Sequence, residues 1–224
     1  MKTLAIVCVD GMASIFRSLF FRNISPRLYM SDLINERLEK LVEDDSSWHR
    51  ADIKGDEIIL QSTTSLRRIV FLSLRGGMMR KRIRKVKAFM RLYNNPDTVL
   101  LACGKSYGGY NVVKSINSID LWYKKSHLIV ADALWFRKLF RPDLKLPFVQ
   151  KGIYSTNFYQ TNHKRLRGAE MVPGFPEEVN QVNLSQEVSH DPDVLNHFTI
   201  FDSSTMVQEQ IDSSFNILLK LMNL

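Results

Sequence analysis

The chain contains little cysteine and no long apolar run. Only two of its 224 residues are cysteines, Cys8 and Cys103, and each lies within a short apolar segment. Two isolated cysteines do not supply a disulfide or metal framework, so we expect both to be small buried core residues. No apolar stretch approaches the roughly 20 residues that a membrane-spanning helix needs. A disulfide-stabilised scaffold and a helical membrane protein are therefore not expected.

The N-terminal segment lacks the features of a signal peptide. Its apolar run, residues 3–9, is short, is interrupted by Asp10, and is not followed by a clear small-residue cleavage site. The run predicts a first buried strand of a parallel sheet instead. We therefore expect a cytoplasmic protein, with export by a route that needs no signal peptide left open. The length and composition suit a single globular domain spanning 1–224.

The most informative segment lies in the middle of the chain. The apolar run Val99–Cys103 is followed at once by Gly104-Lys105-Ser106-Tyr107-Gly108, and then by a helix-compatible segment. A G-x-S-x-G sequence between a strand and a helix is typical of a sharp turn that presents a nucleophilic serine at its tip. Such a turn requires that positions 104 and 108 lack side chains. An ordinary glycine-rich strand-to-helix turn is the alternative interpretation.

This segment resembles the nucleophile turn of the α/β-hydrolases, in particular their small lipase-like serine esterases. The resemblance implies an α/β fold, with a mostly parallel central sheet flanked by helices on both faces and no large cap domain. It also implies that Ser106 attacks an ester carbonyl and that no cofactor or metal is needed. Backbone N–H groups of Tyr107 and of Met12, which follows Asp10-Gly11, would form the oxyanion hole. A plain strand-to-helix turn at residues 10–14 is the alternative there.

The order of the remaining polar residues is compatible with the triad order of the same family. Asp132 follows the next apolar run, residues 127–131, and is the expected acid. Capping of the segment that follows is the alternative role for Asp132. His197 lies shortly before the last helix, where the family places its base, and we expect it to serve as that base. His190, a little earlier in the chain, is the alternative base.

Outside this segment, apolar periodicity and turn signals outline the other elements. A helix is expected to begin near Ser31 as its N-cap, and the apolar, arginine-containing segment 13–30 is either a lid or core packed under a loop. Residues 48–68 carry no clear pattern apart from a short apolar segment at 57–60. The other expected elements are strands at 69–74, 152–160 and, at an edge, 179–184, and helices at 79–93, 110–119 and from about 203 to the C-terminus.

Positive charge is concentrated in one helix. The net charge is +8, and the helix expected at 79–93 contains seven Lys and Arg residues between 80 and 91, with apolar residues at helical spacing between them. A solvated helix face is the simplest interpretation. Contact with an anionic lipid surface is second and nucleic acid a distant third. The residues expected to make such a surface contact are Arg80, Arg82, Arg84 and Lys87.

Together these patterns predict a serine hydrolase that cleaves carboxylic esters, with a lipid or phospholipid ester as the concrete substrate. The apolar segment 13–30 favours an acyl chain, and the basic residues favour an anionic substrate or surface. The alternative is a catalytically inactive protein of the same fold that binds anionic lipid, or another partner, through helix 79–93. The oligomeric state is not readable from the sequence.

Overall fold

The structure is a computed structural model of the chain. It describes residues 1–11, 29–75, 78–134, 138, 141, 143–147, 149–161, 168–172, 179–186 and 205–223. The strands are β1 (Lys2–Val9), β2 (Trp48–Lys54), β3 (Glu57–Ser62), β4 (Arg67–Leu74), β5 (Thr98–Lys105), β6 (Lys125–Ala131), β7 (Ile153–Tyr159) and β8 (Val179–Asn183). The principal helices are α2 (Met30–Asp44), α3 (Met79–Leu92), α4 (Tyr107–Ile116) and α7 (Thr205–Asn223).

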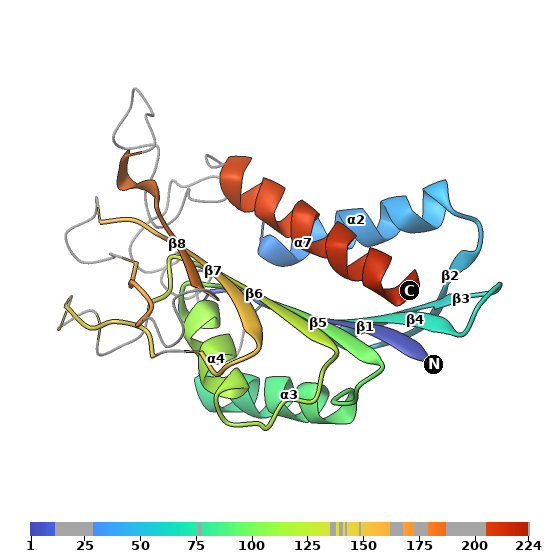
Figure 1. Ribbon diagram of the computed structural model, residues 1–224, viewed down its shortest axis with the longest axis horizontal. Helices are drawn as coiled ribbons and strands as arrows, with labels where there is room; N and C mark the ends of the chain where they lie inside the picture. The colour runs from blue at the N-terminus through green and yellow to red at the C-terminus, as the bar shows by residue number, and fades with distance from the viewer. Residues whose placement is uncertain are drawn as a thin grey trace.

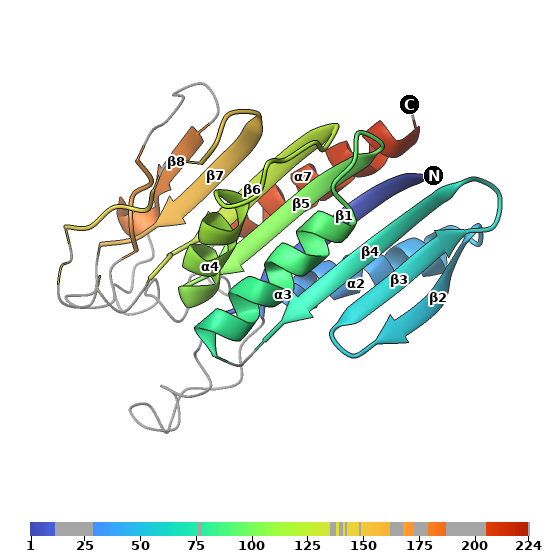
Figure 2. The same cartoon turned by 90° about the horizontal axis from the view of Figure 1, so that it is seen from below.

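One eight-stranded sheet organises these elements, in the order β2-β3-β4-β1-β5-β6-β7-β8 (Figure 2). The six strands β4, β1, β5, β6, β7 and β8 are all parallel to one another, whereas β3 is antiparallel to both β2 and β4. The predicted α/β class with a mostly parallel sheet is confirmed. Because the central strands are parallel, their carboxyl ends meet along one edge of the sheet, where α/β proteins place their sites.

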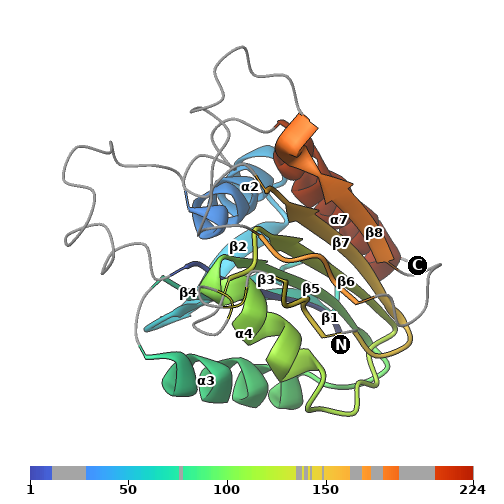
Figure 3. The ribbon, with the colours of Figure 1, turned by 90° about the vertical axis from the view of Figure 1, so that its left-hand side faces the viewer.

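The core forms two layers of side chains, one on each face of the sheet. On β1, residues Ala5, Val7 and Val9 belong to one apolar cluster with α3 and α4, and the alternate residues belong to a second cluster with α2 and α7. Figures 1 and 3 show the same arrangement, with α2 and α7 on one side of the sheet and α3 and α4 on the other. The continuous apolar runs of the central strands follow from this burial on both faces.

Most of the expected elements are present, with two differences. Residues 48–62 form an antiparallel hairpin, β2–β3, which their weak pattern did not predict. Ser31 is not the N-cap of α2, because the helix already begins at Met30 and Tyr29 precedes it in an extended conformation. Strand β8 lies at the edge of the sheet, as predicted.

The two cysteines are buried and reduced, as expected for core residues. They lie side by side on β1 and β5, and burial raises the pKa of both thiols. Among the described helices, none has both the length and the apolarity to cross a membrane. Residues 13–28 of the predicted lid segment lie outside the described residues, and its last residue, Met30, is buried at the start of α2.

Candidate active site

Ser106 occupies the turn between β5 and α4 with an unusual backbone. Its φ is 54° and its ψ is −127°, and apart from Asp132 it is the only non-glycine residue with positive φ in the described part of the chain. A residue with a β-carbon rarely adopts this conformation, which costs about 1–3 kcal/mol unless the surroundings enforce it. Hydrogen bonds enforce it here: Ser106 N donates to Ala131 O at 3.0 Å, and Leu134 N donates to Ser106 O at 3.1 Å.

Three glycines make room for this turn. A β-carbon on Gly104 would lie 2.7 Å from the backbone of Gly109, and one on Gly108 would lie 1.7 Å from the carbonyl oxygen of Val9. A β-carbon on Gly109 would press on Val130 of the next strand at 2.9 Å. Positions 104 and 108 must therefore lack side chains, as predicted, because the first turn of α4 packs directly on β1 and β5.

The chain leaving β1 passes against the serine side chain. A β-carbon on Gly11 would lie 2.7 Å from Ser106 Cβ and 3.2 Å from Ser106 Oγ. Ser106 is only 8% exposed, so it is more covered than the expected position at the tip of a turn. Tyr107 is the first residue of α4, so its N–H lies at the helix N-terminus. Met12, the other expected oxyanion donor, lies outside the described residues.

Asp132 lies next to the serine turn and is fully buried. Residues 131 and 134, on either side of it, are those that hydrogen-bond the Ser106 backbone. Its carboxylate accepts hydrogen bonds from Gln160 N at 3.3 Å and Gln160 Nε2 at 3.1 Å. Its own φ of 48° is the second positive value among the non-glycine residues in the described part of the chain. The expected nucleophile and acid are therefore neighbours in the fold.

Sequence reasoning missed the residues that hold this carboxylate. Gln160 directly follows β7, and a β-carbon on Gly168 would lie only 2.0 Å from Asp132 Oδ1, so the chain at 168 closes over the acid. The signal that would have found them is the strand order. Strands β6 and β7 are adjacent and parallel, so the residues that follow them meet at the same edge. Without the strand order that inference is not available.

Both expected bases, His197 and His190, lie outside the described residues. Two histidines are described elsewhere: His49 is exposed on β2, and His127 is buried on β6 with its Nδ1 3.2 Å from Ser214 Oγ of α7. Neither is recorded in contact with Ser106 or Asp132 within the described part of the chain. The structure thus brings together the serine and the acid of the expected triad, and the base stays a prediction.

A buried aspartate anchors the chain that leads to Gly11. The carboxylate of Asp10 accepts hydrogen bonds from Met30 N at 2.9 Å and Ser31 Oγ at 2.6 Å, at the start of α2. Burial raises the pKa of Asp10, and these two hydrogen bonds act in the opposite direction. Arg82 Nη1 donates to the Asp10 carbonyl oxygen at 2.8 Å. The strand end next to Ser106 is therefore tied to both α2 and α3.

The position of Arg82 corrects one expectation. Its side chain is only 2% exposed, so it does not belong to the surface face proposed for anionic contacts. Arg80 and Arg84 are exposed, as a surface role requires, and Lys87 is half-buried. The sequence pattern hid this difference, because Arg82 belongs to a run of three consecutive cations and yet lies beside Ile83 on the buried side of α3.

The described residues contain no group of three or more His, Cys, Asp or Glu side chains placed to hold a metal ion. Comparisons of the chain with protein-family models, with curated proteins and with solved structures found no significant match. The functional argument therefore depends on the geometry of the site.

Proposed function

We propose that the protein is a serine hydrolase of the α/β-hydrolase type that cleaves carboxylic esters, with a lipid or phospholipid ester as substrate. The observation that carries the proposal is the backbone of Ser106, with φ 54° and ψ −127° between a buried parallel strand and a helix. A serine in this conformation, in a turn whose glycines exclude side chains, is typical of an activated nucleophile. A turn that only reverses the chain would place glycine at such a position.

In this mechanism Ser106 Oγ attacks the ester carbonyl while its proton passes to a histidine, His197 or alternatively His190. The tetrahedral oxyanion is stabilised by the N–H groups of Tyr107 and Met12. The histidine then protonates the leaving alcohol as the ester C–O bond breaks, which leaves an acyl group on Ser106. Water, deprotonated by the same histidine, attacks the acyl-enzyme and releases the carboxylic acid and free Ser106.

Asp132 would act on the histidine rather than on the substrate. A buried carboxylate that accepts a histidine N–H holds the ring in the productive tautomer and stabilises the imidazolium form. Two features support this role: its neighbours hold the Ser106 backbone, and Gln160 hydrogen-bonds the carboxylate while Gly168 packs against it. The proposal includes a single compact domain without a large cap, with helices on both sheet faces.

Covalent labelling with a fluorophosphonate, read by intact mass, tests the proposal. We expect one adduct on the wild type and on Ser213→Ala, an exposed serine of α7, and none on Ser106→Ala. His197→Ala should slow labelling strongly, and the same effect in His190→Ala instead would move the base to that residue. A folded wild-type protein that stays unlabelled, including by a small probe that a lid would admit, would contradict the proposal.

The exposed basic face of α3 supports a second candidate function, binding to an anionic lipid surface. The helix sequence contains no acidic residue, and of its exposed cations only Lys85 has a recorded ion pair within the described residues, with Asp56. Salt-sensitive retention on anionic vesicles, lost in an Arg80→Ala/Arg84→Ala variant, would support this function. Equal retention by the variant, or on neutral vesicles, would contradict it.

A further inference from the structure

A cleft of about 660 Å³ lies beside the candidate active site but is not part of it. It is formed where α2, the β2–β3 hairpin, the carboxyl end of β4 and the first turns of α3 meet. Its volume falls within the usual range for small-molecule sites, roughly 300–1,000 Å³. The lining residues are Asn35, Ile53, Gly55, Asp56, Ile58, Phe71, Ser73, Leu74, Arg75, Lys81, Arg82 and Lys85.

One wall of the cleft is an apolar row that crosses three strands. Ile53 of β2 is paired with Ile58 of β3, which is paired in turn with Phe71 of β4. Directly paired residues of antiparallel strands lie on the same face of the sheet, so the three side chains form a continuous strip. Phe71 is buried at one end, whereas Ile53 is 58% exposed at the other. The strip therefore leads from solvent to the core.

The charged residues that line the cleft are mainly basic. Four cations, Arg75, Lys81, Arg82 and Lys85, line the cleft, and the lining contains a single carboxylate, that of Asp56. Two of these cations are already engaged, because Arg75 pairs with Asp32 and Lys85 with Asp56. Lys81 is exposed and has no ion pair with the described residues. Arg82 is held in place by its hydrogen bond to the Asp10 carbonyl oxygen.

A cleft lined by both an apolar strip and a set of cations matches a ligand with two different ends. We propose that this cleft binds a single-chain amphiphile with an anionic head group, a carboxylate or a phosphate. The chain lies along Ile53, Ile58 and Phe71, and the head group is bound by Lys81 with Arg82 nearby. A neutral amphiphile would leave this positive charge uncompensated, and a bare anion would leave the apolar strip exposed to water.

The inference does not depend on the chemistry of Ser106, although the two regions are linked. Arg82 lines the cleft and donates to Asp10, and the next residue, Gly11, contacts Ser106. Binding can be measured in a Ser106→Ala variant with ligands that contain no ester bond. A failure of ligand binding and a failure of the hydrolase mechanism are therefore distinguishable.

Isothermal titration calorimetry of the Ser106→Ala variant would measure four ligands below their micelle concentrations: dodecanoate, dodecyl phosphate, dodecanol and inorganic phosphate. We expect the two anionic amphiphiles to bind and the other two to bind at least tenfold more weakly. The stronger of the anionic pair identifies the head group. Equal binding of dodecanol, or equal binding of phosphate without a chain, would overturn the inference.

Matched variants locate the site. Lys81→Ala should weaken binding of the preferred ligand about tenfold, the effect of one lost hydrogen bond to a charged group. Lys40→Ala, an exposed cation of α2 outside the cleft, should not change it. Ile53→Asp should abolish binding, because it places a charge in the apolar strip. Leu66→Asp, at a site 79% exposed and outside the cleft, should not change binding. Equal losses in the paired variants would overturn the assignment to this cleft.

Discussion

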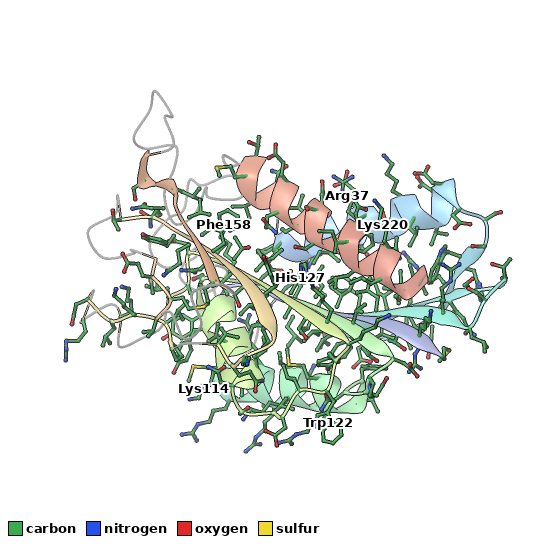
Figure 4. All side chains as sticks on the ribbon, in the orientation of Figure 1. Arg37, Lys114, Trp122, His127, Phe158 and Lys220 are labelled. Atoms are coloured by element: carbon green, nitrogen blue, oxygen red, sulfur yellow. The ribbon has the colours of Figure 1, made fainter. Side chains whose placement is uncertain are left out.

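Strand β6 is associated with two buried polar groups that differ in backbone and in surroundings. In the first pair, Asp132 follows the carboxyl end of β6 and lies beside Ser106. In the second pair, His127 lies within β6 and beside Ser214 of α7. His127 lies between the sheet and α7 (Figure 4). At the first pair both residues have positive φ, whereas Ser214 and His127 have the regular backbone of a helix and a strand.

The second pair resembles a catalytic serine and histidine in composition alone. Ser214 and His127 share a hydrogen bond of 3.2 Å, and Gln210 Nε2 donates to the same hydroxyl at 3.1 Å. His127 is 7% exposed, and burial, with a smaller effect of Lys125, lowers its pKa to about 4. His127 pairs in register with Leu101, well before the serine turn, and a base this weak fits a structural role. A strained backbone at a strand end is therefore better evidence for chemistry than a serine–histidine contact.

The largest expected effect concerns the acid of the first pair. Asp132→Asn should slow fluorophosphonate labelling of Ser106 by about 10⁴-fold, because an amide cannot stabilise the imidazolium form of the base. The measurement is the second-order labelling rate by intact mass, with Asp120→Asn, an exposed aspartate, as control. An unchanged labelling rate in a folded Asp132→Asn variant would show that Asp132, like His127, has a structural role only.

The second prediction concerns the packing of the serine turn. Gly108→Ala places a β-carbon 1.7 Å from Val9 O, so α4 must move away from β1, and unfolding should become easier by about 3 kcal/mol. Gly152→Ala isolates the backbone cost, because Gly152 has φ 89° with open space around it. We expect about 1 kcal/mol there, from urea unfolding. Equal losses would indicate that the glycines serve only backbone conformation.

The third prediction uses the pH dependence of the second pair. The pKa of His127 is about 4 when folded and 6.5 when exposed, so between these values the unfolded chain binds the proton and the folded one does not. The contribution of His127 to stability should therefore be fully present above pH 6.5 and be lost as the pH falls toward 4, by up to about 3 kcal/mol. His127→Gln should remove this contribution, and His49→Gln, at an exposed site, should not.

Urea unfolding of the wild type, His127→Gln and His49→Gln at pH 4.5, 5.5 and 7 would measure the contribution of His127. The quantity to compare is the change in unfolding free energy with pH, wild type minus variant, because other groups titrate in the same range. An identical pH dependence in wild type and His127→Gln would contradict the assigned burial of this imidazole.

The smallest expected effect is that of Ser214→Ala. It removes the hydroxyl that contacts His127 and Gln210, and stability should fall by about 1–2 kcal/mol. Its exposed neighbour Ser213→Ala should change stability by less than about 0.5 kcal/mol. Neither variant should change the rate of fluorophosphonate labelling. A marked loss of labelling in Ser214→Ala would remove the distinction between the two pairs.

Local pattern predicted the strands and helices of the parallel part well. Apolar runs such as those at β1 and β5 are unambiguous because both faces of these strands are buried. The β2–β3 hairpin was not predicted, because its residues alternate weakly and much of it is exposed. Ser31 was misassigned as an N-cap, because its hydroxyl serves Asp10, 21 positions away in the chain, and no local rule describes that partner.

Sequence by itself determined the strand–turn–helix around Ser106, since glycine spacing and an apolar run are local properties that only a few backbone conformations satisfy. Tertiary structure alone decided that Asp132 lies beside this turn, that Gln160 hydrogen-bonds its carboxylate while Gly168 packs against it, and that Arg82 is buried. It also decided that an apolar row and a set of cations share one cleft. These contacts join residues far apart in the chain, and the physical reason they form is the order in which the strands pair, which is a property of the whole sheet.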